Sequence, residues 1–126
     1  TDLGVVPHYI VEMLHNVDVL FFETNHDREM MENDPYPEDS PKRYSDELKK
    51  RILGAQGHLS NDDAASALLD IIGEKTGHVL LSHLSENYNT PKKAYQTVRG
   101  LLRKFSINTA VHLTNRHRPS DIIKIQ

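Results

Sequence analysis

The sequence contains no cysteine, which excludes both disulfide bonds and a thiolate zinc site. It has no apolar run long enough to span a membrane and no signal-peptide pattern, so we expect no membrane partner and a cytoplasmic location. The net charge of -3 excludes a generally basic nucleic-acid-binding surface. The first residue is not methionine, which suggests a fragment or a processed chain.

What is present is the composition of an ordinary globular protein. The 126 residues are 37% hydrophobic and 26% charged, which fits one small domain. Eight histidines are more than usual. Without thiolates, any metal site in this chain would have to combine histidines with carboxylates.

Apolar periodicity predicts alternating helices and strands. Helices are expected near 6–14, 42–53, 61–72 and 91–105, with a loop after a short helical turn between 28 and 41. Short apolar strands are expected at 19–22, 78–81, 109–113 and 122–125. On the first helix Val6, Tyr9, Ile10, Met13 and Leu14 are expected to share a face, and on the last helix Ala94, Val98, Leu101 and Phe105. This order indicates an α/β layer.

The stretch from 57 to 89 carries two histidines at suggestive places. His58 lies in a turn before Ser60, which is expected to cap a helix with acidic residues in its first turn. His83 follows the apolar strand at 78–81, and ligands collect at the carboxyl ends of strands in α/β sheets. We therefore expect His58 and His83 on one rim.

A second polar cluster, Glu23-Thr24-Asn25-His26-Asp27, follows the strand at 19–22. It also falls at a strand's carboxyl end, although a helix cap within a solvated loop explains it equally well. Asp2, taken alone, reads as the cap of the first helix. The basic residues of the 42–53 helix could face phosphates, but a solvated helix face is the commoner explanation; they are Lys42, Arg43, Lys49, Lys50 and Arg51.

Several short motifs, in this order and spacing, resemble one protein family. They are Thr1-Asp2-Leu3-Gly4, the Glu23 to Asp27 cluster, Gly57-His58-Leu59-Ser60, Leu80-Leu81-Ser82-His83-Leu84-Ser85 and Arg116-His117-Arg118-Pro119-Ser120. Together they resemble the carboxyl-terminal half of a metallo-β-lactamase-fold nuclease of the WalJ/YycJ (VicX) branch, with ribonuclease Z as a more distant relative.

The resemblance implies a fold and a metal site. Residues 1–126 would form the carboxyl-terminal half of a domain built as a four-layer αββα sandwich. Two divalent metal ions, Zn or Mn, would be bridged by Asp2 and held at one end by His83. The remaining ligands in the family come from a His-x-His-x-Asp-His motif and a further histidine upstream of Thr1. This chain would then supply only part of a dinuclear site.

The resemblance also implies roles for the neighbouring residues. His58 would stand near the phosphate, with Ser60 and Asn61 as substrate-binding residues at the helix N-terminus. Asn25, His26 and Asp27 are the further catalytic candidates. Ribonuclease Z carries a His-Glu-Ala-Thr motif here whose histidine is a proton donor, but Phe22 occupies that histidine's position, so the donor is not assigned. His78, His112 and His117 are expected to be structural or exposed.

The expected function is metal-dependent phosphodiester hydrolysis, by an exonuclease acting on single-stranded DNA or RNA. Two alternatives remain: a hydrolase of a small ester or thioester on the same fold, and an inactive fragment kept for partner contacts. The isolated chain is expected to be inactive because it has too few metal ligands. Its apolar strands are typical of a sheet covered on both faces, which predicts docking to the missing amino-terminal half or self-association.

Overall fold

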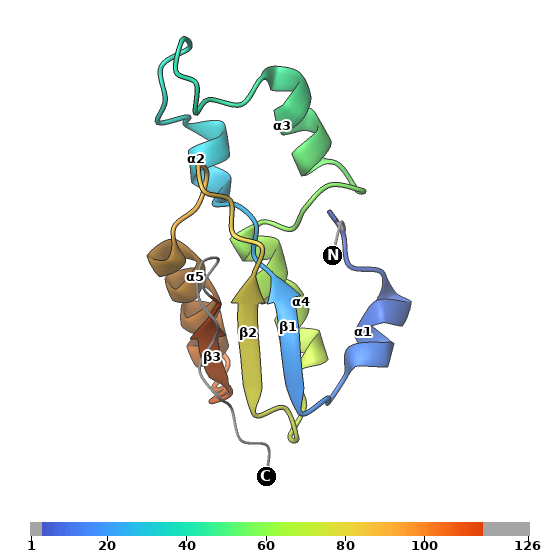
Figure 1. Cartoon of the computed structure of the whole chain (residues 1–126). Coiled ribbons are helices and arrows are strands. Elements are labelled where there is room, and N and C mark those ends of the chain that lie inside the picture. Colours follow the sequence, from blue (N-terminus) through green and yellow to red (C-terminus); the bar gives the residue numbers. More distant parts are fainter. Residues whose placement is uncertain (1–3, 115–126) are drawn as a thin grey trace.

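The computed structural model describes residues 4–114, and within them helices and strands alternate as predicted (Figure 1). Three parallel strands form one sheet in the order β1-β2-β3, with β2 in the middle. The α/β class is therefore confirmed. The elements are α1 His8–Leu14, β1 Val19–Glu23, α2 Arg28–Glu32, α3 Asp46–Leu53, α4 Asn61–Ile71, β2 His78–Ser82, α5 Pro91–Lys104 and β3 Ala110–Leu113. The strand predicted at 122–125 lies outside the described residues.

The main core lies between one face of the sheet and the helices α4 and α5. Alternate strand residues point into it because successive side chains of a strand face opposite sides. On α4, Ala64, Ala65 and Leu68 are fully buried. The buried members of this core are Leu20, Phe22, Leu59, Ala64, Ala65, Leu68, Ile71, Val79, Leu81, Ala94, Val98 and Leu102.

Side-chain caps fix where the helices begin. The hydroxyl of Ser60 accepts a hydrogen bond from the Asp63 amide at 3.0 Å, and that of Thr90 accepts one from Lys93 at 3.0 Å. The Ser60 cap was predicted, and Pro91 takes the first position of α5, where proline is tolerated. The helix predicted from residue 42 instead starts at residue 46, because the Ser45 hydroxyl caps it.

Two helical faces differ from the predicted ones. On α1, Tyr9 and Met13 are 61% and 72% exposed, and Val11 packs against the core in their place. On α5, Leu102 is fully buried while Phe105 is 56% exposed. Phe105 is the residue that ends α5, so it no longer follows the helical repeat. Local spacing sets the period of a helix, but the neighbouring elements decide which stripe is covered.

The other face of the sheet carries no helix in the described part of the chain (Figure 1). Phe21, Leu80 and His112 are register partners on this face, and Phe21 is 65% exposed. Leu80 is only 2% exposed, and His78 Nδ1 lies 2.9 Å from His112 Nε2. The open face is therefore less apolar than predicted, and its exposed apolar surface centres on Phe21.

A second, smaller core joins α2, α3 and the loop before α5. Tyr88 is fully buried at its centre, and its ring packs against those of Tyr36 and Tyr44 at centroid distances of 5.5 and 4.5 Å. The Asp34 carboxylate accepts hydrogen bonds from the Tyr88 hydroxyl at 2.5 Å and from Lys49 at 2.6 Å. Lys49 therefore forms a mostly buried ion pair with Asp34 and does not face a phosphate in solution.

Acid should unfold the protein partly through Asp34. Burial alone would raise the pKa of this carboxyl, but hydrogen bonds from Lys49, Tyr88 and the Tyr36 amide outweigh it and lower the pKa to about 2. The folded-state pKa is depressed, so this contribution is present above pH 4 and is lost as pH falls from about 4 to about 2. A pKa lowered by about two contributes about 2 kcal/mol to the free energy of unfolding.

Asp34→Asn should therefore lower the free energy of unfolding by about 2 kcal/mol at pH 7 and flatten its decline between pH 4 and 2. Urea titrations at several pH values measure both effects. Asp39→Asn, which changes an exposed carboxylate in the same loop, is the matched control and should follow the parent. Parallel pH profiles for Asp34→Asn and the parent would show that this ion pair does not set acid stability.

Candidate active site at the carboxyl ends of the strands

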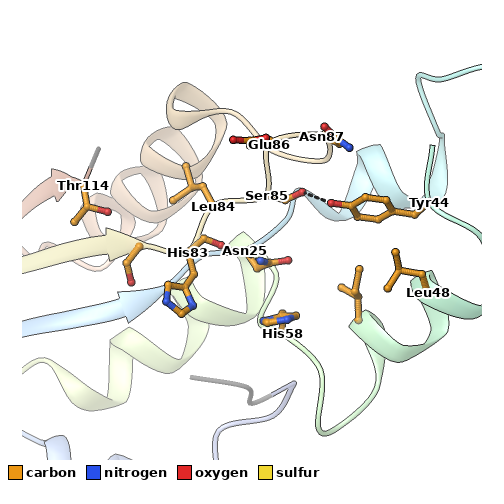
Figure 2. Close-up of a pocket in the computed structure, with 12 residues that line it drawn as sticks. Asn25, Tyr44, Leu48, His58, His83, Leu84, Ser85, Glu86, Asn87 and Thr114 are labelled. Carbon is orange, nitrogen blue, oxygen red and sulfur yellow. Dashed lines mark hydrogen bonds between the residues drawn. The ribbon is translucent and has the colours of Figure 1, made fainter. Parts of the chain in front are cut away.

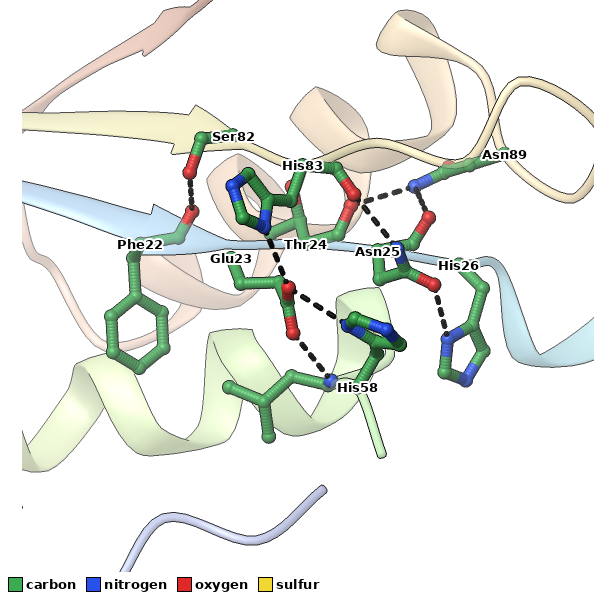
Figure 3. A network of polar contacts seen from close by, with 10 residues as sticks. Phe22, Glu23, Thr24, Asn25, His26, His58, Ser82, His83 and Asn89 are labelled. Carbon is green, nitrogen blue, oxygen red and sulfur yellow. Dashed lines mark hydrogen bonds and ion pairs between the residues drawn. The ribbon is translucent and has the colours of Figure 1, made fainter. Parts of the chain in front are cut away.

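A buried carboxylate, Glu23, joins the two histidines predicted to share a rim. Its Oε2 atom accepts hydrogen bonds from His58 Nδ1 at 3.0 Å and from His83 Nδ1 at 3.1 Å (Figure 3). Its Oε1 atom accepts a hydrogen bond from the Leu59 amide at 3.2 Å. The Glu23 side chain is 3% exposed, so these three donors satisfy a charge that would otherwise be unstable in the interior. The predicted common rim of His58 and His83 is confirmed.

Parallel strand pairing brings this cluster together. Glu23 is the last residue of β1 and pairs with Ser82, the last residue of β2. His83 follows directly, with a φ of 57°. Residues other than glycine rarely adopt this left-handed conformation, and it is often retained at functional sites. The two strands therefore end at the same edge of the sheet and deliver Glu23 and His83 side by side.

His58 reaches the cluster from the turn between α3 and α4. Its amide donates to the Ile52 carbonyl at 2.9 Å, and the next residue is tied to β1 because the Leu59 carbonyl accepts from the Asn25 amide at 2.9 Å. Gly57 makes the turn possible. A Cβ at Gly57 would lie 2.1 Å from the Ile52 oxygen and 2.3 Å from the Arg51 oxygen, which no side chain can tolerate without movement of the backbone.

Gly57→Ala is expected to lower the free energy of unfolding by about 1–3 kcal/mol and to displace His58, because the added methyl group meets backbone atoms. Gly100→Ala is the matched control: a Cβ there has nothing within 4 Å, and alanine in the α5 helix should stabilise by about 1 kcal/mol. Urea unfolding of both variants checks that the first substitution destabilises the protein and the second stabilises it. A Gly57→Ala variant as stable as its parent would mean that the turn has room.

His58 and His83 border a pocket of about 710 Å³ (Figure 2). The histidine side chains are partly open to solvent, His58 at 31% and His83 at 53%. The far wall is formed by Tyr44 and by α3. The residues that line the pocket are Asn25, Tyr44, Leu48, Ile52, His58, Ser82, His83, Leu84, Ser85, Glu86, Asn87 and Thr114. The volume is in the range of small-ligand sites.

The three catalytic candidates after β1 have different surroundings. Asn25 lines the pocket and its amide donates to the His83 carbonyl at 2.8 Å. His26 is 1% exposed, and burial lowers the pKa of its imidazole, with the nearby His58 adding to the effect. Asp27 caps α2 by accepting from the Met30 amide at 3.2 Å. Neither His26 nor Asp27 lines the pocket, and the catalytic roles of all three stay predictions.

The two predicted substrate-binding residues hold the loops together. Ser60 is 2% exposed and its hydroxyl caps α4. Asn61 is fully buried, and its side-chain amide exchanges two 2.9 Å hydrogen bonds with that of Asn89. Asn89 also donates to the Thr24 carbonyl at 3.0 Å, which ties three loops at the strand ends (Figure 3). Neither residue lines the pocket, so their contact with substrate stays a prediction.

The predicted metal ligands are only partly visible. Asp2 lies outside the described residues, so its distance to His83 is not defined. Among residues 4–114, no group of three or more histidine, aspartate and glutamate side chains has a metal-binding arrangement. The role of His83 as a metal ligand therefore stays a prediction.

The role of Glu23 was not predicted from the sequence, where the residue was only one member of the polar cluster. The available signal was a carboxylate directly at the end of an apolar strand. Phe22, at the position of the ribonuclease Z histidine, is 7% exposed and belongs to the main core. The neighbouring glutamate therefore faces the site while the phenylalanine faces the opposite side of the sheet.

The chain is similar in sequence to two exodeoxyribonucleases over part of their length. No protein-family model matches the chain. Exodeoxyribonuclease YycJ of Bacillus anthracis is 34% identical over 126 residues, covering 97% of this chain and 45% of that protein. Exodeoxyribonuclease WalJ of Streptococcus pneumoniae is 32% identical over 111 residues, covering 88% of this chain and 38% of that protein. The chain thus spans less than half the length of these curated relatives.

The fold has a known counterpart as well. The crystal structure of the metallo-β-lactamase fold protein YhfI from Bacillus subtilis matches 95% of this chain and 36% of its own, with a TM-score of 0.52 and 14% sequence identity. The partial coverage of these relatives fits the carboxyl-terminal half that the motifs indicated. The chain is therefore similar to the YycJ and WalJ exodeoxyribonucleases over part of their length, and its fold is an α/β part of the metallo-β-lactamase fold.

Proposed function

We propose that the protein is a metal-dependent phosphodiester hydrolase, an exonuclease of DNA or RNA, and that this chain supplies part of a dinuclear metal site. The observation that carries the proposal is the buried Glu23 carboxylate, which holds His58 and His83 at the edge of the pocket. The exodeoxyribonuclease homologues support the same class of reaction. A cytoplasmic location stays a prediction; no helix among residues 4–114 is long and apolar enough to cross a membrane.

The chemistry of the two histidines fits metal binding. Each donates its Nδ1 proton to the carboxylate of Glu23, since a carboxylate only accepts hydrogen bonds. The Nε2 atom of each ring is then the nitrogen with a lone pair for a cation. Metal-binding histidines almost always donate their other ring nitrogen to a carboxylate or carbonyl in this way. His83 would be a terminal ligand, and Asp2 would bridge two ions.

Two bound divalent ions, Zn or Mn, would polarise the phosphodiester and supply a hydroxide. The residues of this chain would orient the reacting groups. Glu23 fixes the ring plane of His83. His58, held by the same carboxylate, would stand beside the phosphate, where its Nε2 atom could take up a proton and pass it to the leaving oxygen. Asn25 would hold the His83 backbone through its bond to the carbonyl.

The activity of the purified protein tests this proposal. With Mn²⁺ or Zn²⁺ added, it should release nucleotides from single-stranded DNA or RNA, and chelation should stop the reaction. Faster hydrolysis of a small ester or thioester than of either nucleic acid would support the second function expected from the sequence. Residues 1–126 alone are expected to be inactive, and nuclease turnover by them at an ordinary enzymatic rate would contradict the half-site proposal.

The open face of the sheet suggests how the chain is completed. We propose that residues 1–126 form the carboxyl-terminal half of one domain, and that the rest of the protein covers Phe21 and supplies the remaining metal ligands. Burying one phenylalanine contributes roughly 1.5–3 kcal/mol. This contribution is smaller than the cost of bringing two chains together, so in isolation the chain should self-associate only weakly through this face. Sedimentation of residues 1–126 measures this, and a stable monomer at high concentration would argue against an unpartnered face.

A further inference from the structure

We propose that the pocket wall formed by Tyr44, Leu48 and Ile52 is a nucleobase subsite, which makes the end of a single-stranded nucleic acid the substrate. This inference rests on the proposed nuclease function and assigns to that site a surface that determines substrate specificity. The wall lies across the pocket from His83, with His58 between them (Figure 2). A nucleotide whose phosphate lies at the histidines would extend its base toward this wall.

The charges around the pocket separate a phosphate end from a base end. Lysine and arginine are absent from the described residues that line it, and Glu86 supplies the carboxylate among them. Lys49, the basic residue of α3 nearest in sequence to Leu48, is paired with Asp34. The far wall therefore attracts no phosphate. An apolar surface with an aromatic ring suits a neutral, flat base.

Tyr44 is held rigidly in place for this role. Its hydroxyl lies 3.1 Å from the Ser85 hydroxyl, its amide donates to the Tyr88 hydroxyl at 3.0 Å, and its ring packs on that of Tyr88 at 4.5 Å. A side chain that is already ordered loses little conformational entropy when a ligand stacks on it. Tyr88 in turn is fixed by Asp34, so the small second core supports the wall from behind.

Polar groups between the two ends suit the edges of an unpaired base. Asn25 and Asn87 line the pocket, and their side-chain amides each donate one N–H within the protein, to the His83 and Lys42 carbonyls. A side-chain amide has two N–H groups and a carbonyl oxygen, so each keeps a second donor for a base edge. A base bound here would have left its stack and its pairing partner, which a single-stranded end allows without the energy of unpairing a duplex. The wall therefore favours single-stranded over double-stranded substrate.

The test compares two substrates of the metal-loaded protein: a single-stranded oligonucleotide, and the same oligonucleotide with abasic residues in place of both terminal nucleosides. The parent protein should prefer the normal ends in kcat/KM by roughly tenfold or more. Tyr44→Leu should bring that ratio close to one, whereas Tyr44→Phe, which keeps the ring, should preserve it. Tyr9→Leu, an exposed tyrosine on α1 away from the pocket, is the matched control and should keep the parent ratio.

A parent protein that cleaves both substrates equally well, or a Tyr44→Leu variant that keeps the parent ratio, overturns the subsite while leaving the nuclease function intact. Cleavage of neither substrate overturns the proposed nuclease function itself. A second measurement needs no variant: 2-aminopurine at the terminal positions should lose fluorescence when it stacks on Tyr44 in the bound state. Binding without quenching at either end also overturns the subsite.

Discussion

Replacing His83 with alanine is expected to lower the rate of phosphodiester cleavage by on the order of 10³-fold or more. Loss of an outer residue that only orients a metal ligand typically lowers affinity or activity 10–100-fold, and loss of the ligand itself should exceed that range. His83 sits at the end of β2, is 53% exposed at its side chain, and borders the pocket with its ring nitrogen on Glu23. It is therefore available to a cation without rearrangement of the fold.

The effect should appear in metal content as well as in rate. Metal analysis of the purified His83→Ala protein should show less than the parent's amount, and kcat should fall more than KM changes. His8→Ala is the matched control, because His8 is 85% exposed on α1 and pairs only with Glu12 in the described structure. His117→Ala is expected to be mild too. Equal loss of activity in His83→Ala and His8→Ala would remove His83 from the metal site.

The fold could be predicted largely because its signals are local. Ser60 and Thr90 cap helices through amides three residues away, and the strand at 78–81 is a short apolar run between polar residues. Such features depend on a few neighbouring residues. The side of a helix that becomes buried depends instead on distant elements that pack against it. For this reason Tyr9 was predicted to face the core and is exposed instead.

The site was predicted in outline only, because its contacts join distant parts of the chain. His58 and His83 could be placed on one rim from the rule that ligands gather at strand ends. The carboxylate that joins them could not, because Glu23 is 35 residues from His58 and 60 from His83. Asn61 shows the converse: its place at a helix N-terminus suggested ligand binding, but it is fully buried and its side-chain amide pairs with that of Asn89.

Glu23→Gln tests whether the orientation of the histidines matters, because it leaves both His58 and His83 in place and changes only the group that holds them. The change keeps the size of the side chain but replaces one carboxylate oxygen with an NH2 group, which only donates hydrogen bonds. If the remaining oxygen faces His58 and His83, the new amide group opposes the Leu59 amide, and a buried donor loses its partner. If the amide group faces the histidines, each Nδ1 must give up its proton and accept, which moves the proton to Nε2 and blocks metal binding there.

One arrangement lowers the stability of the fold and the other lowers metal affinity, so the two can be told apart. An unsatisfied buried donor would lower the free energy of unfolding by about 1–3 kcal/mol with the histidine tautomers unchanged. A tautomer change would lower metal affinity about 10–100-fold, visible in the nitrogen chemical shifts of His83 and in a rate restored by excess metal. Glu12→Gln alters an exposed glutamate–histidine pair and should change none of these quantities. Parent-like stability, metal affinity and rate in Glu23→Gln would mean that the two histidines do not depend on this carboxylate.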